Sequence, residues 1–190
     1  ARGGARDAEI AKQASVRGER VNPLFFFLRM DTHIADNACL IVDGGDFVAT
    51  AAYTLRPRQP LSWLDPGVFG TLGVGGGFAL GAALCRPESE LWLIYGDGSC
   101  AYSLAEFDTC ARHGLAPIAV VGNDGSWAQI ARDQVDFLGD DVGTVLERRD
   151  YHKVAEGYGG VGLLLKKNED IDDVLGAAKE HARQKRPVLI

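Results

Sequence analysis

The sequence predicts an α/β fold, a parallel sheet of about six strands with helices on both faces. Short apolar runs alternate along the chain with longer amphipathic segments, which is the order of strands and helices in such a sheet. Two of the runs, 91–95 and 118–121, break into glycine turns that carry polar side chains. Because the carboxyl ends of parallel strands meet at one edge, these turns should lie side by side, where ligands bind.

The composition is that of one globular domain. The chain has 190 residues, of which 46% are hydrophobic and 24% charged. A formal charge of −6 without a basic cluster argues against a nucleic-acid partner. Cys39, Cys85, Cys100 and Cys110 form no CxxC pair, so we expect reduced core residues and no zinc site. No apolar run approaches the roughly 20 residues that cross a bilayer.

Residues 1–34 are expected to be an incomplete linker and docking segment. Residues 1–22 are rich in Ala, Arg and Gly, which predicts a linker or a frayed helix. Asn22-Pro23 is a turn signal before an apolar run, and it predicts a helix that docks on the domain. Phe25, Phe26 and Phe27 in this run would form an exposed patch on an isolated domain, which suggests a partner surface.

Residues 35–190 are expected to form a single domain. Its first strand is predicted at 39–42, before a glycine turn and a helix at 47–53. Residues 56–66 contain three prolines and are expected to form a loop. The small residues of 78–84 predict a helix that can pack very closely against its neighbours.

The second half of the domain continues the alternation. Asp150 and Asn168 are predicted to cap the helices that follow them. The glycine-containing, acidic stretch 136–149 is aperiodic and predicts a mobile loop. The other predicted elements are strands at 91–95, 118–121, 161–165 and 188–190 and helices at 102–112, 127–134, 151–155 and 169–184.

The glycine run 73–77 does not fit a dinucleotide site. Phe78 stands where the third glycine of that fingerprint belongs, and the run follows a Pro/Gly loop instead of a strand. The lysine of a nucleotide P-loop is also absent. Close packing at a helix start is an equally good interpretation of these glycines.

The turns after the two central strands indicate a metal and a diphosphate. Asp97 and Asp124 would lie side by side, and carboxylate oxygens suit a hard cation such as Mg²⁺. Gly98 and Ser99 stand at a helix start, where backbone N–H groups favour phosphate. Taken alone, Gly96-Asp97-Gly98 also fits a turn in which the aspartate caps a helix.

Together the two turns resemble the Mg- and diphosphate-binding motif of the thiamine-diphosphate-dependent enzymes. That motif is GDG, then a helix and a strand, then NN. The resemblance implies that Asp97, Asp124 and the backbone carbonyl of Ser126 bind Mg²⁺. This chain has Asn123-Asp124 in place of Asn-Asn, and Asn123 is the alternative ligand if the turn is shifted by one residue.

Further segments extend the resemblance over about 35–190. Residues 63–73 resemble the segment that holds the aminopyrimidine ring in acetohydroxyacid-synthase-like members, and 150–159 resembles a segment near the end of that domain. By this match Leu72 is the apolar wedge that bends the cofactor, and the Gly70 carbonyl accepts from its amino group. The implied cofactor-binding residues are Gly44, Gly45, Asp46, Gly70, Leu72, Gly96, Asp97, Gly98, Ser99, Asn123 and Asp124.

Within the family, 42–47, 63–66 and 121–124 are most similar to acetolactate-synthase-like lyases that act on 2-hydroxyacyl-CoA. The resemblance implies cleavage to formyl-CoA and an aldehyde one carbon shorter, a step of fatty-acid alpha-oxidation. An acetolactate-synthase-type carboligase of 2-oxoacids and a non-catalytic relative are the alternatives.

The resemblance places no catalytic residue in this chain. The activating glutamate is expected in a pyrimidine domain, which together with a middle domain lies outside these 190 residues, so the fragment alone is expected to be inactive. The same resemblance implies a homo-oligomer, at least a dimer with shared active sites, at the endoplasmic-reticulum membrane. Trp127 and Gln129 follow the metal turn and either face the substrate channel or pack the next helix.

Overall fold

The computed structural model describes residues 2–16 and 18–190, and its centre is a six-stranded sheet. The strand order is β2-β1-β3-β4-β6-β5, and every neighbouring pair is parallel, as the sequence predicts. The strands are β1 (Cys39–Val42), β2 (Trp63–Leu64), β3 (Leu91–Gly96), β4 (Ile118–Gly122), β5 (Val161–Gly162) and β6 (Val188–Leu189). Strands covered on both faces read as continuous apolar runs, which is the pattern of β1 and β3.

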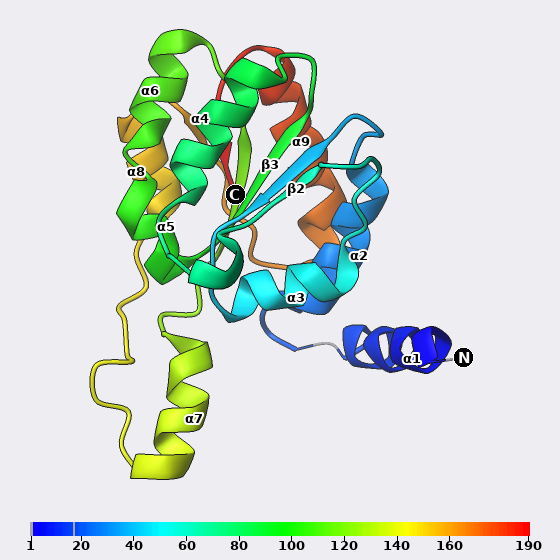
Figure 1. Cartoon of the computed structure of the whole chain (residues 1–190), viewed down its shortest axis with the longest axis vertical. Helices are drawn as coiled ribbons and strands as arrows, with labels where there is room; N and C mark the ends of the chain where they lie inside the picture. Colours follow the sequence, from blue (N-terminus) through cyan, green and yellow to red (C-terminus); the bar gives the residue numbers. More distant parts are fainter. Residues whose placement is uncertain (1, 17) are drawn as a thin grey trace.

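Helices cover both faces of the sheet (Figure 1). One layer contains α4, α5, α6 and α8, and the other contains α2, α3 and α9. The helices are α1 (Arg2–Ala14), α2 (Pro23–His33), α3 (Asp46–Thr54), α4 (Gly75–Cys85), α5 (Asp97–Ser103), α6 (Glu106–His113), α7 (Ala128–Leu138), α8 (Tyr151–Gly157) and α9 (Ile171–Arg183), with 3-10 turns at η1 (Gly67–Phe69) and η2 (Asn168–Asp170). None of the helices within the described residues combines the length and apolarity needed to cross a membrane.

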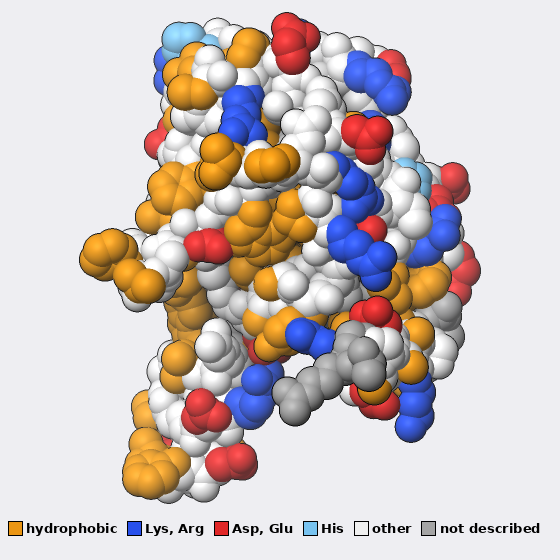
Figure 2. Space-filling model, turned by 45° about the vertical axis from the view of Figure 1, so that its right-hand side comes forward, with side chains coloured by type: hydrophobic (Ala, Val, Ile, Leu, Met, Phe, Trp, Pro, Cys, Tyr) orange, Lys and Arg blue, Asp and Glu red, His pale blue; other side chains and the backbone are white. Residues whose placement is uncertain are grey.

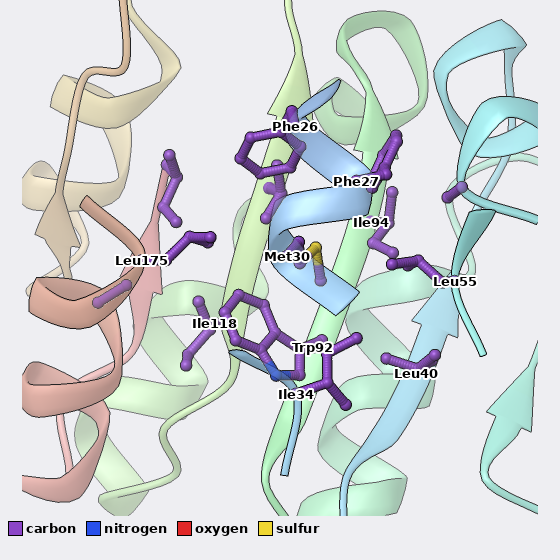
Figure 3. Packing of buried hydrophobic residues seen from close by; sticks show 14 of the residues in the cluster. Phe26, Phe27, Met30, Ile34, Leu40, Leu55, Trp92, Ile94, Ile118 and Leu175 are labelled. Atoms are coloured by element: carbon purple, nitrogen blue, oxygen red, sulfur yellow. The ribbon is translucent and has the colours of Figure 1, made fainter. Parts of the chain in front are cut away.

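The docking helix α2 is part of the hydrophobic core. Phe26, Phe27 and Met30 belong to the same buried cluster as Trp92 and Ile94 of β3, with α2 lying across the central strands (Figure 3), and Phe27 is 0% exposed. The predicted docking is confirmed, but the predicted exposed phenylalanine patch is wrong because the helix turns these rings onto the sheet of its own chain.

A local cap fixes where α2 begins. The Asn22 side chain accepts hydrogen bonds from the backbone N–H groups of Leu24 and Phe25, at 2.9 and 3.2 Å. Pro23 follows at the first helical position, where its missing N–H costs nothing. Before this cap, α1 forms a helix over residues that the sequence left as linker or frayed helix.

Three local predictions are wrong for tertiary reasons. Trp63 and Leu64, in the predicted loop, form the edge strand β2 because they pair with Leu40 and Ile41. The predicted helix 102–112 is two helices, since α5 begins already at Asp97 and ends at Ser103 before α6 begins. The predicted strand 161–165 ends at Gly162, where pairing with β6 stops.

Two predicted caps and one cysteine also differ from expectation. Asp150 binds the ammonium of Lys153 at 2.6 Å and accepts no capping hydrogen bond. Asn168 is buried, and its side-chain oxygen accepts from the Asn22 backbone N–H at 3.0 Å, which ties the amino-terminal segment to η2. Cys85 is exposed at the end of α4, whereas the other three cysteines are buried as predicted.

Candidate functional site

The turns after β1 and β3 are joined directly at the carboxyl edge of the sheet. The backbone N–H of Gly96 donates to the Gly44 carbonyl at 3.2 Å. The buried Ser99 hydroxyl lies 3.2 Å from the same carbonyl and 3.1 Å from that of Gly96. Glycine suits this close approach, because a Cβ on Gly96 would make a tight contact of 3.1 Å with the Gly44 oxygen. The predicted cofactor residues Gly44, Gly45, Gly96 and Ser99 are therefore neighbours.

Asp97 connects this pair of turns to the turn after β4. Its side chain is buried, with 2% of its surface exposed. One carboxylate oxygen accepts from the Gly98 N–H at 2.8 Å, and the other accepts from the Gly125 N–H at 2.7 Å. Gly96 also pairs with Gly122 in the sheet. The two turns predicted to hold the metal thus share a hydrogen bond.

Asp124 lies in the third turn with its carboxylate facing solvent. Its side chain accepts from the Ser126 N–H at 3.0 Å. Partial burial raises the pKa of Asp124 above its ordinary value, and the negative charges of Asp97 and Asp46 raise it further. A carboxylate that is repelled by two neighbouring negative charges is one that a divalent cation would stabilise.

Asn123 is turned toward a neighbouring loop. Its side-chain amide donates to the Arg149 carbonyl at 2.8 Å, and the residue is exposed. Ser126 is half-buried, and its hydroxyl lies 3.2 Å from the Thr144 carbonyl. Of the two candidates for the second side-chain ligand, Asn123 is engaged by a neighbouring loop, while Asp124 senses the negative charge of Asp97.

Asp43, which the sequence analysis did not single out, fixes the loop that carries Leu72. Its buried carboxylate accepts from the Gly73 N–H at 2.8 Å and from the Gly75 N–H at 2.6 Å. Burial raises the pKa of Asp43, and the two hydrogen bonds partly oppose the shift. An acidic residue directly after a buried strand was the available signal, but its partners lie 30 and 32 residues away.

Leu72 is placed over the first turn. A Cβ on Gly44 would lie 2.1 Å from a Leu72 methyl carbon, so the side chain rests directly on the glycine. Leu72 is nevertheless partly open to solvent, at 36% exposed. Gly70, the predicted acceptor for the amino group, is exposed and ends η1 at a φ of 56°. The predicted wedge and the predicted diphosphate turn are thus in contact.

Trp127 packs against the second turn. A Cβ on Gly98 would lie 2.3 Å from the Trp127 ring. The ring centroid is 6.5 Å from that of Tyr102, which is exposed on α5. Gln129 is exposed. Trp127 therefore borders the candidate site, and only a residue without a side chain fits beneath it.

The donor set fits Mg²⁺ and a diphosphate. Within residues 2–16 and 18–190, no three His, Cys, Asp or Glu side chains gather into a metal site. The predicted set needs only two carboxylates and a backbone carbonyl, because phosphate oxygens commonly complete a Mg²⁺ shell. The N-cap residue of α5 is Gly96, which has no side chain to cap the helix, and within the first turn the Asp97 carboxylate accepts from the Gly98 N–H. These features agree with an anion and a hard cation at this edge.

Comparison with known proteins identifies the family to which the chain is similar. Residues 43–190 match the family described as thiamine pyrophosphate enzyme, C-terminal TPP binding domain. The 2-hydroxyacyl-CoA lyase 2 of Danio rerio is 51% identical over 185 residues, which cover 96% of this chain and 30% of the relative. A probable acetolactate synthase of Mycobacterium bovis is 35% identical over 164 residues, which cover 85% of this chain and 29% of the relative.

A solved structure confirms the fold. The thiamine diphosphate-dependent 4-hydroxybenzoylformate decarboxylase of Rhodococcus jostii RHA1 superposes with a TM-score of 0.83 at 22% identity, over 92% of this chain and 33% of that one. The chain thus spans only about a third of the length of the proteins it matches. From the family match and the sequence identities, the chain belongs to the thiamine pyrophosphate enzymes and comprises their C-terminal TPP-binding domain.

Proposed function

We propose that Mg²⁺ binds between the second and third turns and holds the diphosphate of thiamine diphosphate. The proposed protein ligands are the carboxylates of Asp97 and Asp124 and the carbonyl oxygen of Ser126. The observation that carries the proposal is the 2.7 Å hydrogen bond from the Gly125 N–H to Asp97, which draws the third turn onto the buried carboxylate. The engagement of Asn123 with Arg149 favours Asp124 as the second side-chain ligand.

The remaining predicted residues are proposed to contact either the diphosphate or the thiamine part of the cofactor. Gly44, Gly45 and Asp46 in the first turn and Gly98-Ser99 in the second are proposed to border the diphosphate. Leu72 is proposed to bend the cofactor, and the Gly70 carbonyl to accept from its amino group. The contact between Leu72 and Gly44 supports this division, because it puts the wedge next to the diphosphate turn.

The proposed reaction is cleavage of a 2-hydroxyacyl-CoA. The bond between the thioester carbonyl carbon and the hydroxyl-bearing carbon breaks, which gives formyl-CoA and an aldehyde one carbon shorter. Thiamine diphosphate supplies the electron-sink chemistry when it is bound. The residues of this chain hold and bend the cofactor. The 51% identity to the Danio rerio lyase supports this choice of substrate.

The assembly and location of the protein follow from the same proposal. The chain is proposed to be one domain of a longer polypeptide, whose pyrimidine domain supplies the activating glutamate from a partner subunit. On this basis the 190 residues alone are inactive, and a dimer is the smallest active unit. Location at the endoplasmic-reticulum membrane stays a prediction.

A carboligase that joins two 2-oxoacids is the second candidate, favoured by the 35% identity to the Mycobacterium bovis acetolactate synthase. The deciding experiment gives the intact polypeptide, with thiamine diphosphate and Mg²⁺, either 2-hydroxyacyl-CoA or pyruvate. Formyl-CoA release without acetolactate supports the lyase, and the reverse supports the carboligase. Calorimetry on the same sample tests for a non-catalytic relative, which would show no Mg²⁺-dependent cofactor binding.

A further inference from the structure

We propose that Arg132 is a positioning residue that offsets the negative charge of Asp46, so that an anionic diphosphate can bind beside Asp46. The inference rests on the proposed function, because it concerns the same cofactor edge. It assigns a role to a residue of α7, a helix that contributes nothing to the hydrophobic core.

The two residues form an ion pair between α3 and α7. The Arg132 guanidinium lies 2.7 Å from a carboxylate oxygen of Asp46, although the residues are 86 positions apart in the chain. Asp46 is the first residue of α3 and follows the turn after β1. The pair therefore connects the first turn to a helix that follows the third.

Arg132 reaches Asp46 because α7 belongs to an arm with a fixed neck. We define the arm as residues 127–145. Its ends are held together where the Trp127 N–H donates to the Thr144 carbonyl and the Leu146 N–H donates to the Gly125 carbonyl, both at 2.8 Å. The arm stands away from the sheet as a separate lobe (Figures 1 and 2) and has no buried residue in α7.

The neck also leads directly to the proposed metal ligands. Gly125 donates its N–H to Asp97 and accepts at its carbonyl from Leu146, so one residue serves both the metal turn and the neck. Arg148, just past the arm, donates to the Asp124 carbonyl at 3.2 Å. Arg132 in the arm and Arg148 just past it thus contact the first and the third turn, respectively.

Charge balance explains what Arg132 contributes. A Mg²⁺ ion bound by Asp97 and Asp124 balances those two carboxylates. The charge of Asp46 then remains beside a diphosphate that is itself negative, and like charges repel each other. Arg132 is the guanidinium in contact with that carboxylate. Without it, Asp46 would oppose cofactor binding.

A purely structural role makes a different prediction. If the ion pair only holds the arm in place, removal of either partner should have the same effect on the cofactor. If it balances charge, removal of Arg132 should weaken binding, whereas removal of Asp46 should not. Exchange of the two residues for neutral ones therefore separates the two explanations.

The experiment measures the dissociation constant of thiamine diphosphate with Mg²⁺ by calorimetry on the intact polypeptide. We expect Arg132→Gln to raise it by roughly two- to fivefold, as is typical of exposed ion pairs, and Arg132→Lys to retain most of the affinity. Asp46→Asn should lower the dissociation constant, because it removes a negative charge from beside the diphosphate and leaves that of Arg132, and in the double variant the loss seen in Arg132→Gln should disappear. The Arg132→Gln defect should shrink at high salt, since salt screens exposed charges.

Hydrogen exchange of the α7 amides without cofactor gives a second readout, and it should increase in both single variants. Arg112→Gln is the matched control, because Arg112 forms an exposed ion pair of 2.8 Å with Asp108 on α6. Equal losses of affinity in Arg132→Gln and Asp46→Asn, or no loss in Arg132→Gln, would overturn the charge-balancing role alone. Failure of the wild type to bind the cofactor would refute the proposed function together with it.

Discussion

The candidate site has a closed half and an open half. The closed half consists of the turns after β1 and β3, where Asp43, Asp97 and Ser99 are buried and hydrogen-bonded to backbone groups. The open half consists of the turn after β4 and the arm, where Asn123 and Asp124 are exposed and α7 buries no residue. The two halves face each other across the edge where the diphosphate is proposed to bind.

The difference separates what the fold needs from what a ligand needs. A buried carboxylate that accepts backbone hydrogen bonds contributes to folding whether or not a ligand is present. An exposed turn with repelling carboxylates gains most when a cation arrives. Substitutions in the closed half should therefore change both stability and binding, and those in the open half should change binding alone.

The largest expected effect is on metal-dependent cofactor binding. Asp97→Ala and Asp124→Ala should each weaken it by more than the roughly 10- to 100-fold that loss of an outer-shell partner costs at metal sites. Only Asp97→Ala should also destabilise the protein without ligand, by about 1–3 kcal/mol, because the Gly125 N–H loses its acceptor. Calorimetry and urea unfolding measure the two effects, and equal loss of stability in both variants would contradict the comparison.

Asp43→Asn tests the closed half away from the proposed metal. The asparagine side chain has one oxygen and one NH2 group, so it can accept from only one of the Gly73 and Gly75 N–H groups and its NH2 group then faces the other N–H. We therefore expect a loss of about 1–3 kcal/mol in the free energy of unfolding. Asp173→Asn on the exposed side of α9 is the control and should be nearly neutral. Unchanged stability in Asp43→Asn would show that the loop is held by other contacts.

The sequence predicts the closed half better than the open half. Continuous apolar runs ending in glycine turns indicate parallel strands, so the sheet and its ligand-binding edge follow from local pattern. The pairing of Asp43 with Gly73 and Gly75 depends on a loop returning some 30 residues later, which no local pattern encodes. Strand β2 is missed for the same reason, since Trp63 is a strand residue only through its pairing with Leu40.

The contacts of the arm are even harder to predict from the local sequence. The amphipathic sequence of α7 predicts a helix, and the helix is present. Its pattern also predicts a buried apolar face, which the described residues do not provide. The contact of Arg132 with Asp46 joins positions 86 residues apart. The docking of α2 is predicted from the sequence, but local pattern does not show that its phenylalanines are the residues that face the sheet.

Glycine substitutions sharpen the comparison further. A Cβ on Gly76 would lie 2.8 Å from the backbone oxygen of Ser103, so Gly76→Ala should cost about 1–3 kcal/mol through overpacking. The atoms nearest to a Cβ on Gly98 are those of the Trp127 side chain and not of the backbone, so Gly98→Ala should cost less stability but weaken cofactor binding. Gly77→Ala, with nothing within 4 Å, should stabilise α4 by roughly 0.5–1 kcal/mol. A larger stability loss in Gly98→Ala than in Gly76→Ala would contradict the assignment of the arm to the open half.

The smallest effect is a difference in pH dependence between a buried and an exposed carboxylate. Burial raises the pKa of Asp43, so the folded state holds this proton more tightly than the unfolded chain. The stability of the wild type relative to Asp43→Asn should therefore fall as pH rises through the raised value. Hydrogen bonds from Arg29 and then His33 lower the pKa of Asp172, so its contribution has the opposite sign.

The contribution of the Asp172 carboxylate to stability is present above the ordinary carboxyl pKa and is lost as pH falls through the lowered pKa. Because Asp172 and Arg29 are both well exposed, it should not exceed about 1 kcal/mol. Urea unfolding of the wild type, Asp43→Asn and Asp172→Asn from pH 3 to pH 7 measures both slopes. If stability changes with pH in the same direction for Asp43 and Asp172, burial does not control the ionisation of Asp43. The carboxylates of the closed half would then titrate like those of the surface.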